Sequence, residues 1–187
     1  KYEQSTTGSM PTFSDLSRAA YCPRQLYYAR SDDDRGPPPE ATARQALAFR
    51  YDELRSAADE TLAELPIECS PAAYRAALNR LASRPDWESL CTPRERDYFV
   101  EGKDCHGKLH KLLAGEPPVP TVISPGTPPE TGVWEPQTVR AVAAANALAW
   151  ERKQEIPRAL VEYPAVGVVR EVELTCRRTA TYRRVLR

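Results

Sequence analysis

The stretch that most constrains the fold is residues 96–137, where three short strand-like runs precede a helix. Residues 97–103 and 108–113 are rich in aromatic and aliphatic side chains and flank a short turn, a pattern that predicts an antiparallel hairpin. Residues 119–124 predict a third strand. A Pro- and Gly-rich loop follows, and an Ala-rich helix is expected over residues 135–155, with a proline near its first position. This order indicates a sheet with a helix packed closely on it.

The rest of the chain is predicted to be helical before this stretch and mixed after it. Ser14 is expected to cap the first helix, and Ser70-Pro71 a later one that ends near Ser83. Residues 40–65 have largely helical spacing of their apolar side chains. Residues 158–175 contain two β-rich runs around Gly167, and residues 176–187 predict a basic helix. We expect an α/β or α+β fold with a mixed central sheet.

The length of 187 residues suits one compact domain. Residues 1–9 are interpreted as a tag-like or disordered tail, residues 10–95 as an N-terminal helical region and residues 96–187 as the α/β core. The chain carries 26 basic and 26 acidic side chains. Its basic excess lies at the end, where the arginines fit either a solvated helix face or a patch for phosphates: Arg170, Arg177, Arg178, Arg183, Arg184 and Arg187.

The sequence shows neither an apolar run long enough to span a membrane nor a secretory signal, so no membrane association is expected. Five cysteines are scattered along the chain, and none forms a Cys-x-x-Cys pair. An odd, scattered set is typical of reduced thiols rather than of a disulfide framework. We therefore expect a cytoplasmic protein.

Several motifs together resemble the RecB-like, CRISPR-associated adaptation nucleases of the PD-(D/E)xK superfamily. They are Tyr21-Cys22-Pro23-Arg24 in the first helices, then GKLHKLL, PTVISPG and WEPQTVRAVAAANAL in the expected core. The resemblance implies a restriction-endonuclease-like αβββαβ core, with residues 96–187 as its nuclease-like part. It also implies a prokaryotic metal-dependent deoxyribonuclease, with DNA and CRISPR adaptation or repair proteins as partners.

Such nucleases place carboxylates around Mg²⁺ or Mn²⁺, which activates water and neutralises phosphate charge. The resemblance puts His110 where the family has its aspartate, and the Val122–Gly126 segment lacks the family's Glu-x-Lys. Gln137 matches the family's helix glutamine, and Glu135 is a nearby acid. The candidate catalytic residues are therefore His110, Glu135 and Gln137, on a site that has lost most of the family's chemistry.

The family's iron–sulfur site has one early cysteine and three late ones. Cys22 matches the first, but Cys176 is the only late cysteine, so Cys22 is interpreted as a vestigial ligand position and no cofactor is expected. A Mg²⁺ or Mn²⁺ ion is the alternative. Arg24, Lys108 and Lys111 are candidates for contacts with nucleic acid.

Together these observations predict a degenerate, non-catalytic nuclease-fold protein that binds nucleic acid or a partner in CRISPR adaptation or DNA repair. Two alternatives stay open. One is an active metal-dependent DNA exonuclease whose site residues have migrated to His110, Glu130 or Glu135. The other is a structural protein-interaction module that uses tryptophans, of which Trp134 is expected to be the most exposed.

Overall fold

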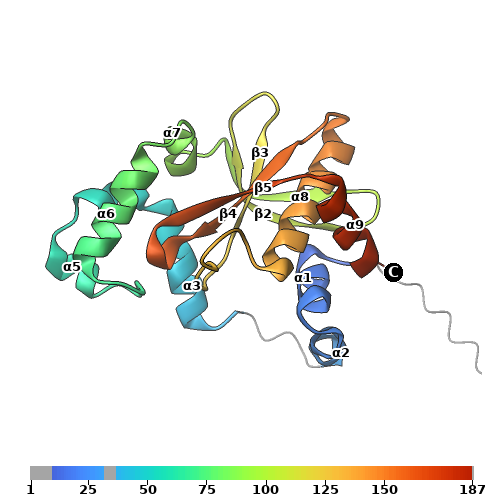
Figure 1. The fold of residues 1–187 in the computed structure, drawn as a ribbon, viewed down its shortest axis with the longest axis horizontal. Coiled ribbons are helices and arrows are strands. Elements are labelled where there is room, and N and C mark those ends of the chain that lie inside the picture. The colour runs from blue at the N-terminus through green and yellow to red at the C-terminus, as the bar shows by residue number, and fades with distance from the viewer. Residues whose placement is uncertain (1–9, 32–36, 187) are drawn as a thin grey trace, which may run out of the picture.

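A computed structural model describes residues 10–31 and 37–186 of the chain and shows an α+β fold around a five-stranded mixed sheet (Figure 1). The strands lie in chain order across the sheet, and β3 and β4 are the parallel pair. The other neighbours are antiparallel. The strands are β1 (Glu95–Glu101), β2 (His106–Leu113), β3 (Val119–Ile123), β4 (Arg158–Tyr163) and β5 (Val168–Glu173).

Helix α8 (Glu135–Arg152) connects β3 to β4 and packs on one face of the sheet together with α1 (Phe13–Tyr21) and α9 (Cys176–Val185). A parallel pair needs a crossover of this kind, because a tight turn would reverse the strand direction. Helix α2 (Pro23–Ser31) follows α1 directly. In Figure 1 these four helices lie on the same side of the molecule.

The remaining helices gather at the other side of the sheet (Figure 1). Their apolar side chains form a second buried cluster with Leu113, Ile123 and Leu160 of the sheet. A short 3-10 turn, η2 (Pro164–Val166), joins β4 to β5. The helical segments of this layer are α3 (Pro39–Ala46), the 3-10 turn η1 (Leu47–Phe49), α4 (Tyr51–Ser56), α5 (Asp59–Ala63), α6 (Pro71–Ala82) and α7 (Trp87–Cys91). The sheet thus separates two hydrophobic cores.

Small residues bring the first layer close to the sheet. All but one of the alanines of α8 are almost completely buried, and a Cβ on Gly102 would lie only 2.7 Å from the Ala147 Cα atom. A Cβ on Gly107 would lie 2.5 Å from the Phe13 ring. Real Cβ atoms do not come so close to other atoms, so these two glycines let α8 and α1 rest directly on the hairpin of β1 and β2.

The structure confirms the expected hairpin, the third strand and the long helix after it. It corrects the start of the first helix, because Thr12 and not Ser14 is the cap. Thr12 Oγ1 accepts from the Asp15 amide, and the Asp15 carboxylate accepts from the Thr12 amide, both at 3.0 Å. The helical pattern of residues 40–65 is divided into separate short helices that wrap around the second core. Among the described helices, none combines the length and the apolar character that crossing a membrane requires.

Candidate nucleic-acid interface

His110 lies where strands β2 and β3 separate. The two strands pair from Leu113 opposite Val119 to Lys111 opposite Thr121, and the ladder ends there. Beyond that point the His110 side chain takes the place of a backbone partner, because its Nδ1 accepts a hydrogen bond of 3.0 Å from the Ile123 amide. A polar side chain therefore fills the gap between the strands.

The imidazole of His110 is neutral at physiological pH. Burial, together with the positive charges of Arg140 and Lys108, lowers its pKa to about 3. Because Nδ1 accepts from Ile123, the proton of the neutral ring lies on Nε2, which is then a donor. In this state neither ring nitrogen has a free lone pair for a metal ion. His110 has the environment of a structural histidine.

Ser124 and Gln137 continue this polar layer toward the surface. The Ser124 amide donates to the Glu162 carbonyl at 2.8 Å, which extends the pairing of β3 with β4 by one residue. Its hydroxyl accepts a long hydrogen bond of 3.5 Å from Gln137 Nε2, in the first turn of α8. The other amide atom, Gln137 Oε1, is buried and has no hydrogen-bond partner in the part of the chain that the structure describes.

Two arginines from different helices meet beside this layer. Arg140 lies one turn after Gln137 on α8, and its Nε atom is buried without a hydrogen-bond partner among the described residues. Burial lowers the pKa of Arg140, and the charge of Arg18 on α1 adds to that effect. An arginine stays charged at neutral pH in spite of such shifts. Two like charges therefore act on each other, and that of Arg140 also acts on the neutral histidine, an arrangement that favours an anion.

A groove of about 580 Å³ opens on the surface where α1, α2 and the start of α8 meet. That volume is within the range of about 300–1,000 Å³ typical of ligand sites. Among the described residues, its walls combine aromatic, amide and hydroxyl groups with one charged side chain, Arg18, and no carboxylate: Ser17, Arg18, Tyr21, Gln25, Trp134, Pro136 and Gln137. The groove and the two arginines make this region the candidate interface.

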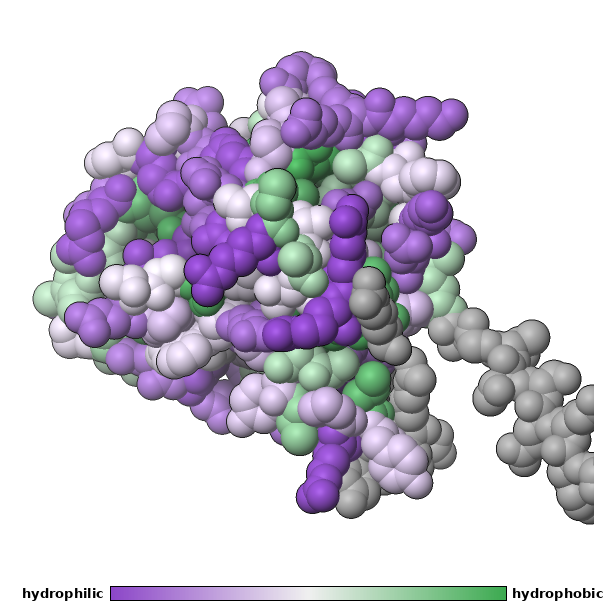
Figure 2. Space-filling view, turned by 45° about the vertical axis from the view of Figure 1, so that its right-hand side comes forward, coloured by the Kyte–Doolittle hydropathy of each residue, from purple (hydrophilic) through white to green (hydrophobic). Residues whose placement is uncertain are grey.

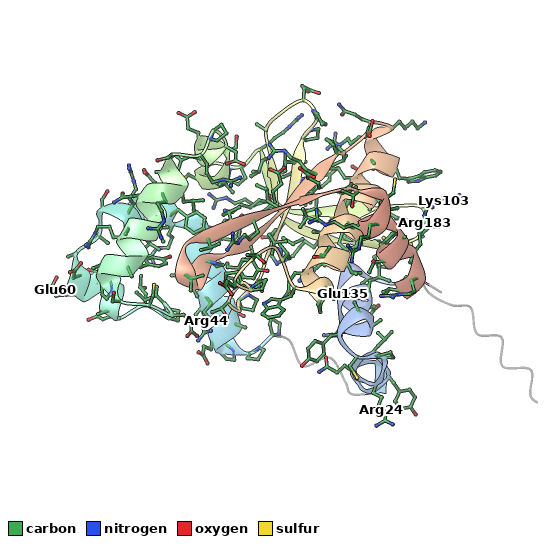
Figure 3. The ribbon with its side chains drawn as sticks, in the orientation of Figure 1. Arg24, Arg44, Glu60, Lys103, Glu135 and Arg183 are labelled. Atoms are coloured by element: carbon green, nitrogen blue, oxygen red, sulfur yellow. The ribbon has the colours of Figure 1, made fainter. Side chains whose placement is uncertain are left out.

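The expected catalytic residues do not interact with one another in a single site. Gln137 lines the groove, whereas the Glu135 carboxylate accepts a hydrogen bond of 3.1 Å from Arg184 on α9. Figure 3 shows Glu135 beside the end of α1 where the chain enters α8. The backbone carbonyl of Glu130 accepts from Arg170 at 3.4 Å. Within the described residues no three His, Cys, Asp or Glu side chains are grouped so that they could hold a metal ion.

The residues expected to contact nucleic acid also differ in their exposure. Arg24 is exposed on α2 and points away from the body of the molecule in Figure 3. Lys108 is exposed and bound to Asp97 at 2.8 Å. Lys111 is completely buried, and its Nζ donates to Glu162 Oε2 inside the second core. The prediction that Lys111 contacts nucleic acid is therefore wrong. Cys22 is a half-buried free thiol at the end of α1, and the cofactor expectation stays a prediction.

The interface residues that sequence reasoning missed are Arg18 and Arg140. Arg140 lies within the quoted stretch WEPQTVRAVAAANAL but not at a position that was singled out, Arg18 precedes the Tyr-Cys-Pro-Arg motif, and the two lie more than a hundred positions apart on α1 and α8. The exposed position of Trp134 was expected, and the structure confirms it with half of the side chain accessible. Trp150, at 58 % against 51 %, is slightly more exposed than Trp134, contrary to the expected ranking. Comparison of the sequence with protein-family models and with curated proteins finds no match.

Proposed function

We propose that this chain is a non-catalytic nucleic-acid-binding protein built on a restriction-endonuclease-like core. The order α1, β1, β2, β3, α8, β4 is that of the αβββαβ core which the sequence resemblance implies. The mixed sheet supports the same core, because α8 connects its parallel strands β3 and β4. Fold analogy alone is a weak basis for function, so the proposal depends on the site.

The observation that carries the proposal is the charge of the region around His110. In the nucleases that the sequence resembles, a carboxylate at this position binds a metal ion. Here the position holds a neutral imidazole under the positive charge of Arg140, and Arg18 acts in turn on Arg140, while the groove residues that the structure describes include no carboxylate. Such a site attracts the phosphates of a nucleic acid and repels the cation that would cleave them.

The resemblance also gives the proposal its biological context, in CRISPR adaptation or DNA repair. A nuclease-like fold without its metal ligands would hold a nucleic acid or a partner for another enzyme to process. The mixed hydrophilic and hydrophobic surface seen in Figure 2 is compatible with both kinds of ligand. The phosphate-binding charge favours the nucleic acid as the direct ligand of this site.

The test is the salt dependence of DNA binding, measured by fluorescence anisotropy in EDTA between about 50 and about 200 mM salt. We expect the affinity to fall with salt, and Arg18→Gln to reduce the slope of log K against log salt by about one. Arg80→Gln is the matched control, because Arg80 is equally an exposed helical arginine but lies on α6, in the other layer. This variant should leave the slope unchanged.

Two results would contradict the proposal. One is absence of binding at the lowest salt, with circular dichroism showing a folded protein. The other is cleavage of single- or double-stranded DNA in Mg²⁺ or Mn²⁺ that stops in EDTA and is lost in His110→Ala. That outcome would mean that an active metal site is built around His110, and the exonuclease alternative would replace the proposal.

A further inference from the structure

Two large aromatic side chains line the groove and are exposed to solvent. Tyr21 on α1 has 69 % of its surface accessible, and Trp134 at the start of α8 has 51 %. Aromatic rings of this size usually dominate cores and interfaces, because burying them releases much apolar surface from water. Two of them at one groove that also carries a charge indicate a surface that is covered by a ligand.

The orientation of Trp134 limits what it can offer to that ligand. Its indole Nε1–H donates to the Thr127 carbonyl at 2.9 Å, so the ring is held in place and its only polar atom is already used. The ring surface is what remains. A fixed ring surface beside open space is suited to stacking on a flat group, since stacking needs no directional hydrogen bond.

The polar groups of the groove match the edge and the charge of a nucleotide. Gln137 Oε1 is a buried acceptor without a partner among the residues described, and a buried acceptor left unpaired is unfavourable. Because Gln137 lines the groove, a turn of its amide would present this acceptor to the exocyclic amino group or ring N–H of a base. Arg18 supplies positive charge at the same groove, and the field of Arg140 adds to it. A flat polar ring with an attached phosphate complements all of these features.

We propose that the groove between α1 and the start of α8 binds one unstacked base of a single-stranded nucleic acid, with the base against Trp134 and its phosphate against Arg18. The inference rests on the proposed function and names the kind of nucleic acid that the site takes. In a duplex both faces of every base are covered by neighbours, so a fixed tryptophan ring gains nothing from it. In a single strand the base faces are free, and stacking on an aromatic side chain is tolerant of sequence.

The test compares two single strands that differ only in their bases: a short oligothymidylate, and the same sugar-phosphate backbone with the bases removed. We expect the wild-type protein to bind the intact strand about ten-fold more tightly than the baseless one. In Trp134→Ala this preference disappears, and in Trp134→Phe most of it returns because a ring is restored. Trp150→Ala is the matched control, since Trp150 is exposed to 58 % but lies at the other end of α8. It should keep the ten-fold preference.

The outcomes separate this inference from the proposed function. If Arg18→Gln lowers the salt slope but Trp134→Ala keeps the preference for bases, the protein binds nucleic acid and the base lies elsewhere, which overturns the inference alone. Equal binding of both strands by the wild type, or tighter binding of a duplex, would also overturn it alone. If neither strand binds at low salt and an acidic peptide does, the groove takes a protein partner, and both proposals are wrong.

Discussion

Replacing Lys111 with methionine should lower the free energy of unfolding by about 3–5 kcal/mol, although the two side chains have similar lengths. Lys111 is completely buried, and its ammonium group uses all three of its donors. These go to the Ala48 carbonyl at 2.7 Å, the Leu90 carbonyl at 2.9 Å and Glu162 Oε2 at 2.9 Å. Methionine would leave all three acceptors without their donor inside the second core.

The magnitude follows from those three acceptors. Each buried carbonyl that loses its partner costs about 1 kcal/mol at the low end of the usual range. The Glu162 carboxylate is also completely buried, and Lys111 is its ion-pair partner, whereas the nearby Tyr51 hydroxyl brings no charge to it. An unpaired buried carboxylate adds about 1–3 kcal/mol, so the sum agrees with the cost measured when one partner of a buried ion pair is removed. This is a large part of a typical stability of about 5–15 kcal/mol.

The assay is urea denaturation followed by circular dichroism at two pH values. Burial already raises the pKa of Glu162, and removing Lys111 raises it further. The folded variant then binds a proton more tightly than the unfolded chain, so its stability falls as the pH rises above the unfolded pKa of about 4.5. The loss caused by Lys111→Met should therefore be smaller at pH 5 than at pH 7.5.

A double variant provides the control. Lys111→Met with Glu162→Leu removes both charges, and replacing a whole buried ion pair by apolar side chains is often neutral or stabilising. We expect the double variant to recover most of the stability that the single variant loses. A double variant as unstable as Lys111→Met would refute the reasoning, because the cost would then come from packing and not from an uncompensated charge.

Two further predictions concern His110 and Gly107. Because the pKa of His110 is lowered to about 3, the unfolded chain takes up a proton that the folded protein does not bind as the pH falls below about 6.5. The free energy of unfolding should therefore fall as the pH falls. Measured by urea denaturation, the stability advantage of the wild type over His110→Asn should shrink by about 2 kcal/mol between pH 7.5 and pH 5. A difference that stays constant over this range would contradict the shifted pKa. Gly107→Ala should cost about 1–3 kcal/mol because its Cβ would meet the Phe13 ring at 2.5 Å. Gly126→Ala, whose Cβ would lie 3.8 Å from the Ser124 hydroxyl, should change thermal stability little. Adding Phe13→Leu to Gly107→Ala should restore part of the loss, and no restoration would locate the strain elsewhere.

Much of the candidate site depends on contacts that local sequence patterns do not contain. Sequence resemblance pointed to His110 and Gln137, and the structure places one between two strands and the other in the groove wall. The basic side chain of Lys111 was a further candidate, for a contact with nucleic acid, but Lys111 alternates with His110 along β2 and faces the second core. Neighbouring residues of a strand point to opposite faces of the sheet. Two adjacent positions can therefore have entirely different surroundings, which a sequence motif does not distinguish.

The sequence by itself determined the local elements. The aliphatic and aromatic runs of the hairpin, the Ala-rich helix after Pro136 and the cap at Ser70 all appear in the structure close to where they were predicted. Each of them depends on residues within a few positions of one another, through side-chain periodicity, capping or the fixed geometry of proline. Such information is contained in a short stretch of chain.

Only the tertiary structure decided which distant groups meet. It paired Lys111 on β2 with Glu162 on β4 and brought Arg18 on α1 close enough to act electrostatically on Arg140 of α8. It also placed Trp134 at a groove that the start of α8 forms with α1 and α2. The order of the strands and the layer to which each helix belongs fix these encounters. They arise from the burial of two hydrophobic cores, which is a property of the whole chain and not of any segment.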